Sequence, residues 1–131
     1  MSSREPARRI LERLLANGPL TALPKRPGDQ HLVALLAATR FSSGETCLEV
    51  EVNARLEAWL ETISLPYGID HVTMRRLLVD SRLLTRTTSG SSYCLNAAQA
   101  AEIDAVRALD PADLLATIAG ERDRRKRQHA A

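Results

Sequence analysis

The spacing of apolar residues predicts two helices in the first 40 residues. In the opening segment the apolar side chains at positions 10, 11, 14 and 15 fall on one stripe and charged ones cover the rest, which is the pattern of an amphipathic helix. The sequence Asn17-Gly18-Pro19 ends it, since glycine tolerates a left-handed cap and proline cannot continue the helix. This helix is expected to pack on the core or on a second subunit. A second helix is expected from Asp29, its N-cap, to Thr39.

Two more helices are predicted in the middle of the chain. Thr46-Cys47-Leu48-Glu49 fits a capping box, in which the threonine hydroxyl and the glutamate carboxylate each satisfy a backbone N–H group. The few residues before it leave room for only a very short strand, and the segment 64–68 breaks the helix that follows. Asp70 is the expected N-cap of the next helix, which runs to Arg82.

The remainder of the chain predicts a hairpin and further helices. Two short β-type runs, Leu83–Thr88 and Ser91–Leu95, are joined around Ser89-Gly90, which indicates a β-hairpin. An Ala-rich helix is then expected over residues 99–109. A last helix begins with an Asp-Pro pair at position 110, because aspartate caps a helix and proline suits its first turn; it is expected to end at Gly120 or in the charged tail.

The order helix, very short strand, helix, helix and hairpin is typical of a winged helix, a relative of the helix-turn-helix whose third helix usually enters the DNA major groove. We therefore expect a mainly α protein with a small β-hairpin: a winged helix-turn-helix core with extra N-terminal and C-terminal helices. Residues 1–28 form the N-terminal helix and linker, 29–96 the winged-helix domain, and 97–131 the C-terminal helices and basic tail.

Composition and charge agree with an ordinary globular domain. The 131 residues are 44% hydrophobic and 26% charged. The net charge of +2 does not by itself indicate a polyanion partner, but residues 45–61 are acidic, 70–86 are basic, and 122–127 hold five cations against one acid. No apolar run approaches the roughly 20 residues that span a bilayer, and the N-terminus lacks a signal peptide's apolar segment. A cytoplasmic location without membrane contact is expected.

Four motifs follow one another along the chain. They are Glu49-Val50-Glu51-Val52-Asn53, Met74-Arg75-Arg76-Leu77-Leu78-Val79-Asp80, Leu83-Leu84-Thr85-Arg86 and Gly90-Ser91-Ser92-Tyr93. Together they resemble a bacterial family catalogued as domain of unknown function 2087, over about half of the chain. The resemblance implies a regulatory context, since members occur alone or attached to helix-turn-helix regulators, and it implies no catalysis. Arg82 departs from the pattern, because the family often has glycine there.

The candidate residues fall into two sets. Candidates for DNA contact are Thr73, Arg75, Arg76, Arg82, Arg86, Thr87 and Ser89, and motif residues with structural roles are Thr46, Glu49, Glu51, Asn53 and Tyr93. Two hypotheses stay open for the adjacent Arg75 and Arg76: one of them pairs with Glu49 or Glu51 and ties the third helix to the second, or at least one reaches a base edge or phosphate. Asn53 is expected to hydrogen-bond a loop or the neighbouring helix.

The sequence offers no chemistry beyond these sets. The three histidines share no metal-ligand spacing, and no nucleophilic triad or phosphate-binding loop is present. We expect no enzyme activity, cofactor, metal or identifiable small-molecule ligand. The lead hypothesis is a homodimeric transcriptional regulator that binds double-stranded DNA; the alternative is a protein–protein interaction module on the same scaffold without nucleic-acid contact. If the short first strand pairs with the last, Cys47 comes near Cys94, and a regulatory disulfide becomes a further hypothesis.

Overall fold

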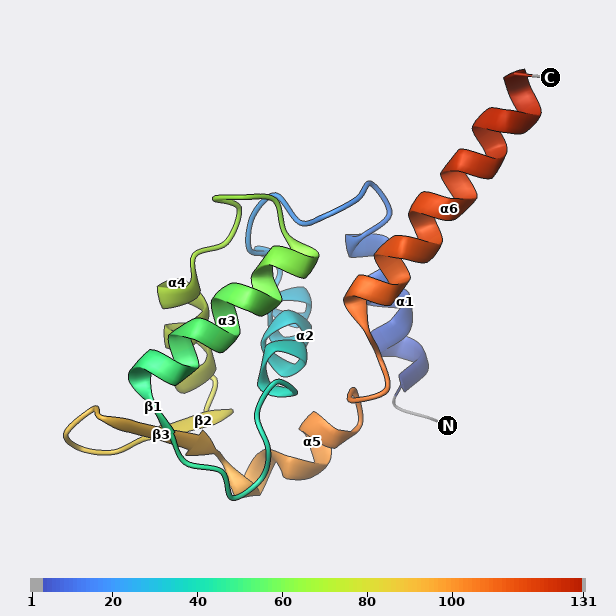
Figure 1. Ribbon diagram of the computed structural model, residues 1–131. Coiled ribbons are helices and arrows are strands. Elements are labelled where there is room, and N and C mark those ends of the chain that lie inside the picture. Colours follow the sequence, from blue (N-terminus) through green and yellow to red (C-terminus); the bar gives the residue numbers. More distant parts are fainter. Residues whose placement is uncertain (1–3, 131) are drawn as a thin grey trace.

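The computed structural model, which describes residues 4–130, has a body of helices with a small sheet at one edge (Figure 1). In chain order the elements are α1 (Arg4–Leu14), α2 (Pro27–Ala38), β1 (Cys47–Leu48), α3 (Glu49–Ile63), α4 (His71–Asp80), β2 (Leu84–Arg86), β3 (Ser92–Leu95), the 3-10 turn η1 (Ala97–Gln99), α5 (Ala100–Asp104) and α6 (Pro111–Ala130). The predicted class, mainly α with a small hairpin, is confirmed.

The sheet has three strands in the order β1-β3-β2, and both pairings are antiparallel. β2 and β3 form the predicted hairpin, with Leu84 opposite Leu95 and Arg86 opposite Tyr93. Gly90 makes the turn at a φ of +74°, a conformation that glycine adopts without steric cost. The hairpin projects from the body beside the N-terminal end of α3 (Figure 1).

The first strand pairs with the last, as expected, and this pairing separates the two cysteines. Cys47 of β1 lies opposite Tyr93 of β3. Successive residues of a strand point to opposite faces of a sheet, so Cys94 lies on the other face from Cys47. The Cys94 thiol instead lies 3.1 Å from the Thr85 hydroxyl. The disulfide hypothesis therefore loses its geometric basis.

The predicted capping box at Thr46 is wrong. α3 begins at Glu49 with Leu48 as its N-cap, and the Glu51 carboxylate accepts the Leu48 N–H group at 3.2 Å. Only this half of a capping box is formed, because leucine has no side-chain acceptor. The pairing of β1 with β3 decides the start: it keeps residues 47 and 48 extended, so that Thr46 lies before the strand and cannot cap the helix.

The predicted start of α2 is also displaced. The helix begins at Pro27 rather than after Asp29, because proline suits the first helical turn, where its missing N–H group is not needed. Asp29 then lies within the first turn, and its buried carboxylate accepts a hydrogen bond from the Arg13 guanidinium at 2.6 Å. This contact joins α1 to α2.

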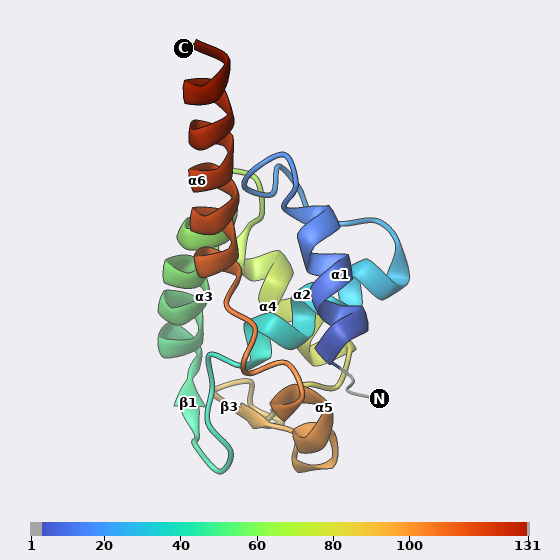
Figure 2. The same cartoon turned by 90° about the vertical axis from the view of Figure 1, so that its right-hand side faces the viewer.

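The C-terminal helices differ from their predicted extents. The Asp110 cap is confirmed, since its carboxylate accepts the Ala112 N–H group at 3.0 Å. The predicted helix over 99–109 is reduced to η1 and the short α5. The predicted end of the last helix, at Gly120 or in the charged tail, is wrong: α6 continues through both to residue 130. Its second half projects beyond every other element (Figures 1 and 2).

A single apolar cluster fills the interior. α2 is its central helix, with every residue from 32 to 38 buried, as expected for a helix segment that is apolar on all sides. Leu11 of α1 and Leu15, which directly follows the helix, belong to the same cluster, so the N-terminal helix packs on the core of its own chain. Residues 1–3 and 131 lie outside the described residues. No helix within residues 4–130 is both long and apolar enough to cross a membrane.

Candidate nucleic-acid interface

α4 presents one face to the core and the opposite face to solvent. Asp70 is its N-cap, as predicted, and accepts the Thr73 N–H group at 3.3 Å. Met74 is fully buried, and the helix packs against α2, α3 and β2. Thr73, Arg76 and Asp80 are exposed, and their spacing of three and four residues places them on one stripe. This stripe is the accessible surface of the helix.

The end of α4 brings a further cation to this side of the molecule. Arg82 has a φ of +62° and is exposed. The Leu83 N–H group donates to the Leu78 carbonyl at 2.9 Å, and the Arg82 N–H group to the Val79 carbonyl at 3.0 Å. This pair of bonds is the Schellman motif, whose left-handed position usually holds glycine. The arginine therefore stands at a strained backbone position with its side chain in solvent.

The hairpin turn is polar and exposed. The hydroxyl oxygens of Thr87 and Ser89 lie 3.2 Å apart, and those of Ser89 and Ser91 lie 2.8 Å apart. The guanidinium of Arg86 lies over the turn, since a Cβ added at Gly90 would meet its Cζ at 3.4 Å. Serine and threonine hydroxyls and arginine are groups that donate hydrogen bonds to phosphate oxygens in protein–DNA complexes.

Arg75 is held inside a polar cluster that we call the clamp: Glu49, Asn53, Arg75 and Tyr93. Arg75 donates to the Asn53 side-chain carbonyl and lies 3.6 Å from the Glu49 carboxylate, to which the Tyr93 hydroxyl donates at 2.9 Å. The clamp thus joins α3, α4 and β3. It confirms that one of the two arginines pairs with Glu49 and that Asn53 hydrogen-bonds a neighbouring helix.

The predicted DNA-contacting residues therefore separate into two groups. The Arg75 side chain is only 17% exposed and is engaged in the clamp, so it does not belong to the accessible stripe. The others, Thr73, Arg76, Arg82, Arg86, Thr87 and Ser89, are all exposed along α4, its end and the hairpin. Among the described residues, none of the three exposed arginines forms an ion pair with a carboxylate.

An ion pair fixes the loop that leads into β1. Arg55 of α3 donates to both carboxylate oxygens of Glu45 at 2.7 Å, and its guanidinium lies 5.4 Å from the centre of the Phe41 ring. The hydrogen bonds from Arg55 lower the pKa of Glu45 to about 2.

Burial raises the pKa of the Cys47 thiol. Within residues 4–130, no group of three or more histidine, cysteine, aspartate or glutamate side chains could hold a metal ion.

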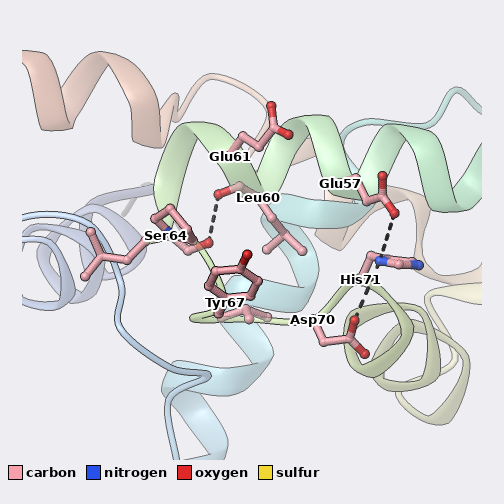
Figure 3. A pocket seen from close by; sticks show the side chains of 10 residues that line it. Glu57, Leu60, Glu61, Ser64, Tyr67, Asp70 and His71 are labelled. Carbon is pink, nitrogen blue, oxygen red and sulfur yellow. Dashed lines mark hydrogen bonds and ion pairs between the residues drawn. The ribbon is translucent and has the colours of Figure 1, made fainter.

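A second surface feature was not expected from the sequence. A groove lies between α3, the segment 64–68 and the start of α4, and Glu57, Tyr67 and His71 line it (Figure 3). The only sequence signal is the pair of glutamates at positions 57 and 61, which a helix places on one face. The groove itself depends on the path of the segment 64–68, which residue spacing does not reveal.

Comparison with known proteins identifies a family. The model of a family described as "Uncharacterized protein conserved in bacteria (DUF2087)" matches residues 19–95, which include the clamp, α4 and the hairpin. No curated protein and no solved structure gives a significant match.

Proposed function

The chain belongs to this DUF2087 family of bacterial proteins, and we propose that it binds double-stranded DNA as a winged-helix transcriptional regulator, acting in the cytoplasm, as a homodimer and without catalysis. One observation carries the proposal. Arg76, Arg82 and Arg86 are exposed along α4 and the adjoining hairpin and form no ion pair with an acid of residues 4–130, while the neighbouring Arg75 is used inside the fold.

In the proposed complex the helix and the hairpin take different roles. In helix-turn-helix proteins the N-terminal residues of the reading helix contact base edges. Thr73 and Arg76 occupy the first turns of α4, and Asp80, which repels phosphate, lies at its C-terminal end. Arg86 and the turn hydroxyls suit backbone contacts beside the groove. Arg82 lies between the two parts and suits a phosphate.

The alternative function is protein binding by the same scaffold. Glu57 and Glu61, which lie on one face of α3 and line the groove beside it, favour this function, because neither the acids nor the groove suits a polyanion. The salt dependence of affinity for a DNA duplex distinguishes DNA binding from protein binding. A DNA contact through several phosphates weakens steeply with salt, with a slope of about −0.9 per phosphate in a plot of log affinity against log salt.

The test is fluorescence anisotropy of a labelled random-sequence duplex at increasing salt. We expect the triple variant Arg76→Gln, Arg82→Gln, Arg86→Gln to bind more weakly, with the magnitude of its salt slope reduced by about 1.8 for the two lost phosphate contacts of Arg82 and Arg86. The matched control removes three exposed cations elsewhere: Arg9→Gln, Lys25→Gln, Arg26→Gln. An equal loss in both variants, or no binding by the unmodified protein at low salt, would contradict the proposal and favour protein binding.

A further inference from the structure

The groove beside α3 combines an apolar floor with an acidic rim. It has a volume of about 650 Å³. Leu60 and Ile69 are largely buried beneath it, and Glu57, Glu61 and Asp70 also line it. The carboxylates of Glu57 and Asp70 are directed toward His71 (Figure 3). Within the described part of the chain, no lysine or arginine lines the groove. An occupant therefore needs positive charge together with apolar surface.

A histidine at the rim already lies against two acids. His71 Nδ1 lies 3.1 Å from the Glu57 carboxylate and 3.6 Å from that of Asp70 (Figure 3). Glu61 has no cationic partner among the described residues. The rim thus keeps a surplus of negative charge for an incoming cation.

An exposed aromatic ring lines the groove. Tyr67 is fully exposed and has a φ of +64°. The segment that carries it is fixed, because the Leu65 N–H group donates to the Leu20 carbonyl at 2.9 Å and the Gly68 N–H group to the Leu65 carbonyl at 2.9 Å. Gly68 permits this close approach, since a Cβ there would lie 3.1 Å from the Leu20 carbonyl oxygen. The ring is therefore presented to solvent by a rigid support.

The opposite charge is found on the projecting half of α6. Residues 121–129 are all exposed, and they include five cations, Arg122, Arg124, Arg125, Lys126 and Arg127, against Glu121 and Asp123. A helix that is polar on all sides gains no stability from packing. Because α6 is one continuous helix directed away from the body (Figures 1 and 2), this tail does not reach the groove of its own chain.

We propose that the basic tail of one chain, residues 124–127, docks in the acidic groove of a second copy, and that the exchange is reciprocal in a two-fold dimer. The long side chains lay their methylene stems on the apolar floor and their charged ends against Glu57 and Glu61. Tyr67 offers its ring face to one of these cations. The interface is isologous, because each chain supplies both a groove and a tail.

The test is a charge exchange between full-length variants, measured by light scattering without DNA. The groove variant carries Glu57→Lys and Glu61→Lys, and the tail variant Arg124→Glu and Arg127→Glu. We expect the unmodified chain, of 14.4 kDa, to form a dimer at low salt that dissociates at about 1 M salt, where the screening length is about 3 Å. Each variant alone should dimerise at least about tenfold more weakly. Their mixture should form a heterodimer, because both contacts are then attractive.

A matched control reverses two acids away from the groove, Asp80→Lys and Asp113→Lys, and should dimerise like the unmodified chain. The proposal is overturned by a monomeric unmodified chain, by variants that dimerise normally, or by a mixture that stays monomeric. It is equally overturned if the tail variant loses only duplex affinity, since the tail then contacts DNA. The inference rests on the dimer of the proposed function and not on its DNA contact, so duplex anisotropy of the same variants separates the two failures.

Discussion

The clamp gives the sharpest prediction about stability, through the single change Tyr93→Phe. The Tyr93 side chain is 2% exposed, and its hydroxyl donates to the Glu49 carboxylate at 2.9 Å. Phenylalanine keeps the buried ring and removes only this bond. A hydrogen bond to a charged group contributes about 1.5–3 kcal/mol. Because the Glu49 side chain is 46% exposed, water replaces part of the loss, and we expect a decrease of about 1–1.5 kcal/mol in the free energy of unfolding.

A double-mutant cycle tests whether the contact itself is the cause. The second change is Glu49→Ala, which removes the acceptor shared by Tyr93 and Arg75. Once the acceptor is absent, Tyr93→Phe should cost little, and the coupling energy should reach about 1 kcal/mol, within the range for residues in contact. Urea unfolding followed by fluorescence of Trp59, the single tryptophan and a buried one, supplies all four free energies.

The same measurements can refute a role of the Tyr93–Glu49 hydrogen bond in stability. Additive effects, with a coupling below about 0.3 kcal/mol, would mean that the hydroxyl contributes nothing through Glu49. A neutral Tyr93→Phe change would mean the same. An altered dependence on urea would instead indicate a change in the compactness of one state, and the contact would then not explain the loss.

Two further changes concern stability at single positions: one should raise the free energy of unfolding, and the effect of the other should depend on pH. Arg82→Gly should raise the free energy of unfolding by about 0.5–1 kcal/mol, because relief at the left-handed position exceeds the added entropy of the unfolded chain; a decrease in urea unfolding would contradict this. For Glu45, whose pKa is lowered to about 2 in the fold, the stabilisation by Arg55 is present above the ordinary carboxyl pKa of about 4.3 and is lost as pH falls toward 2. The stability difference between the unmodified chain and Glu45→Gln should therefore shrink from pH 6 to pH 3, and a constant difference would contradict the assignment.

Local signals account for the parts of the fold that could be predicted. Asp70 and Asp110 cap their helices because a carboxylate beside free N–H groups is a short-range interaction. The Ser89-Gly90 turn and the flanking strands are likewise set by neighbouring residues. Thr46 was wrongly predicted as a cap because the pairing of residues 47 and 48 with residues 92 and 93 determines where α3 begins. The spacing of residues within the helix does not indicate this distant strand.

Six of the seven candidate residues for DNA contact are exposed, as such a role requires, but the position of Arg75 inside the clamp could not be predicted. Arg75 and Arg76 are neighbours in the sequence and point about 100° apart on a helix. Which of them faces α3 depends on how α4 is rotated on the core, and its rotation is set by the packing of Met74 and Leu78. The groove could not be predicted, because it depends on the fixed path of the segment 64–68.

The clamp bears on how far the family motifs support the proposed function. Glu49, Asn53, Arg75 and Tyr93 come from three of the four motifs, and the fold brings their side chains into one set of contacts between α3, α4 and β3. These motif residues therefore explain how the hairpin is held against α4, and they need no ligand to account for their chemistry. Arg76 belongs to the same motif as Arg75 but has no ion-pair partner among the described residues. The case for DNA binding consequently rests on the exposed cations beside the clamp and not on the motif as a whole.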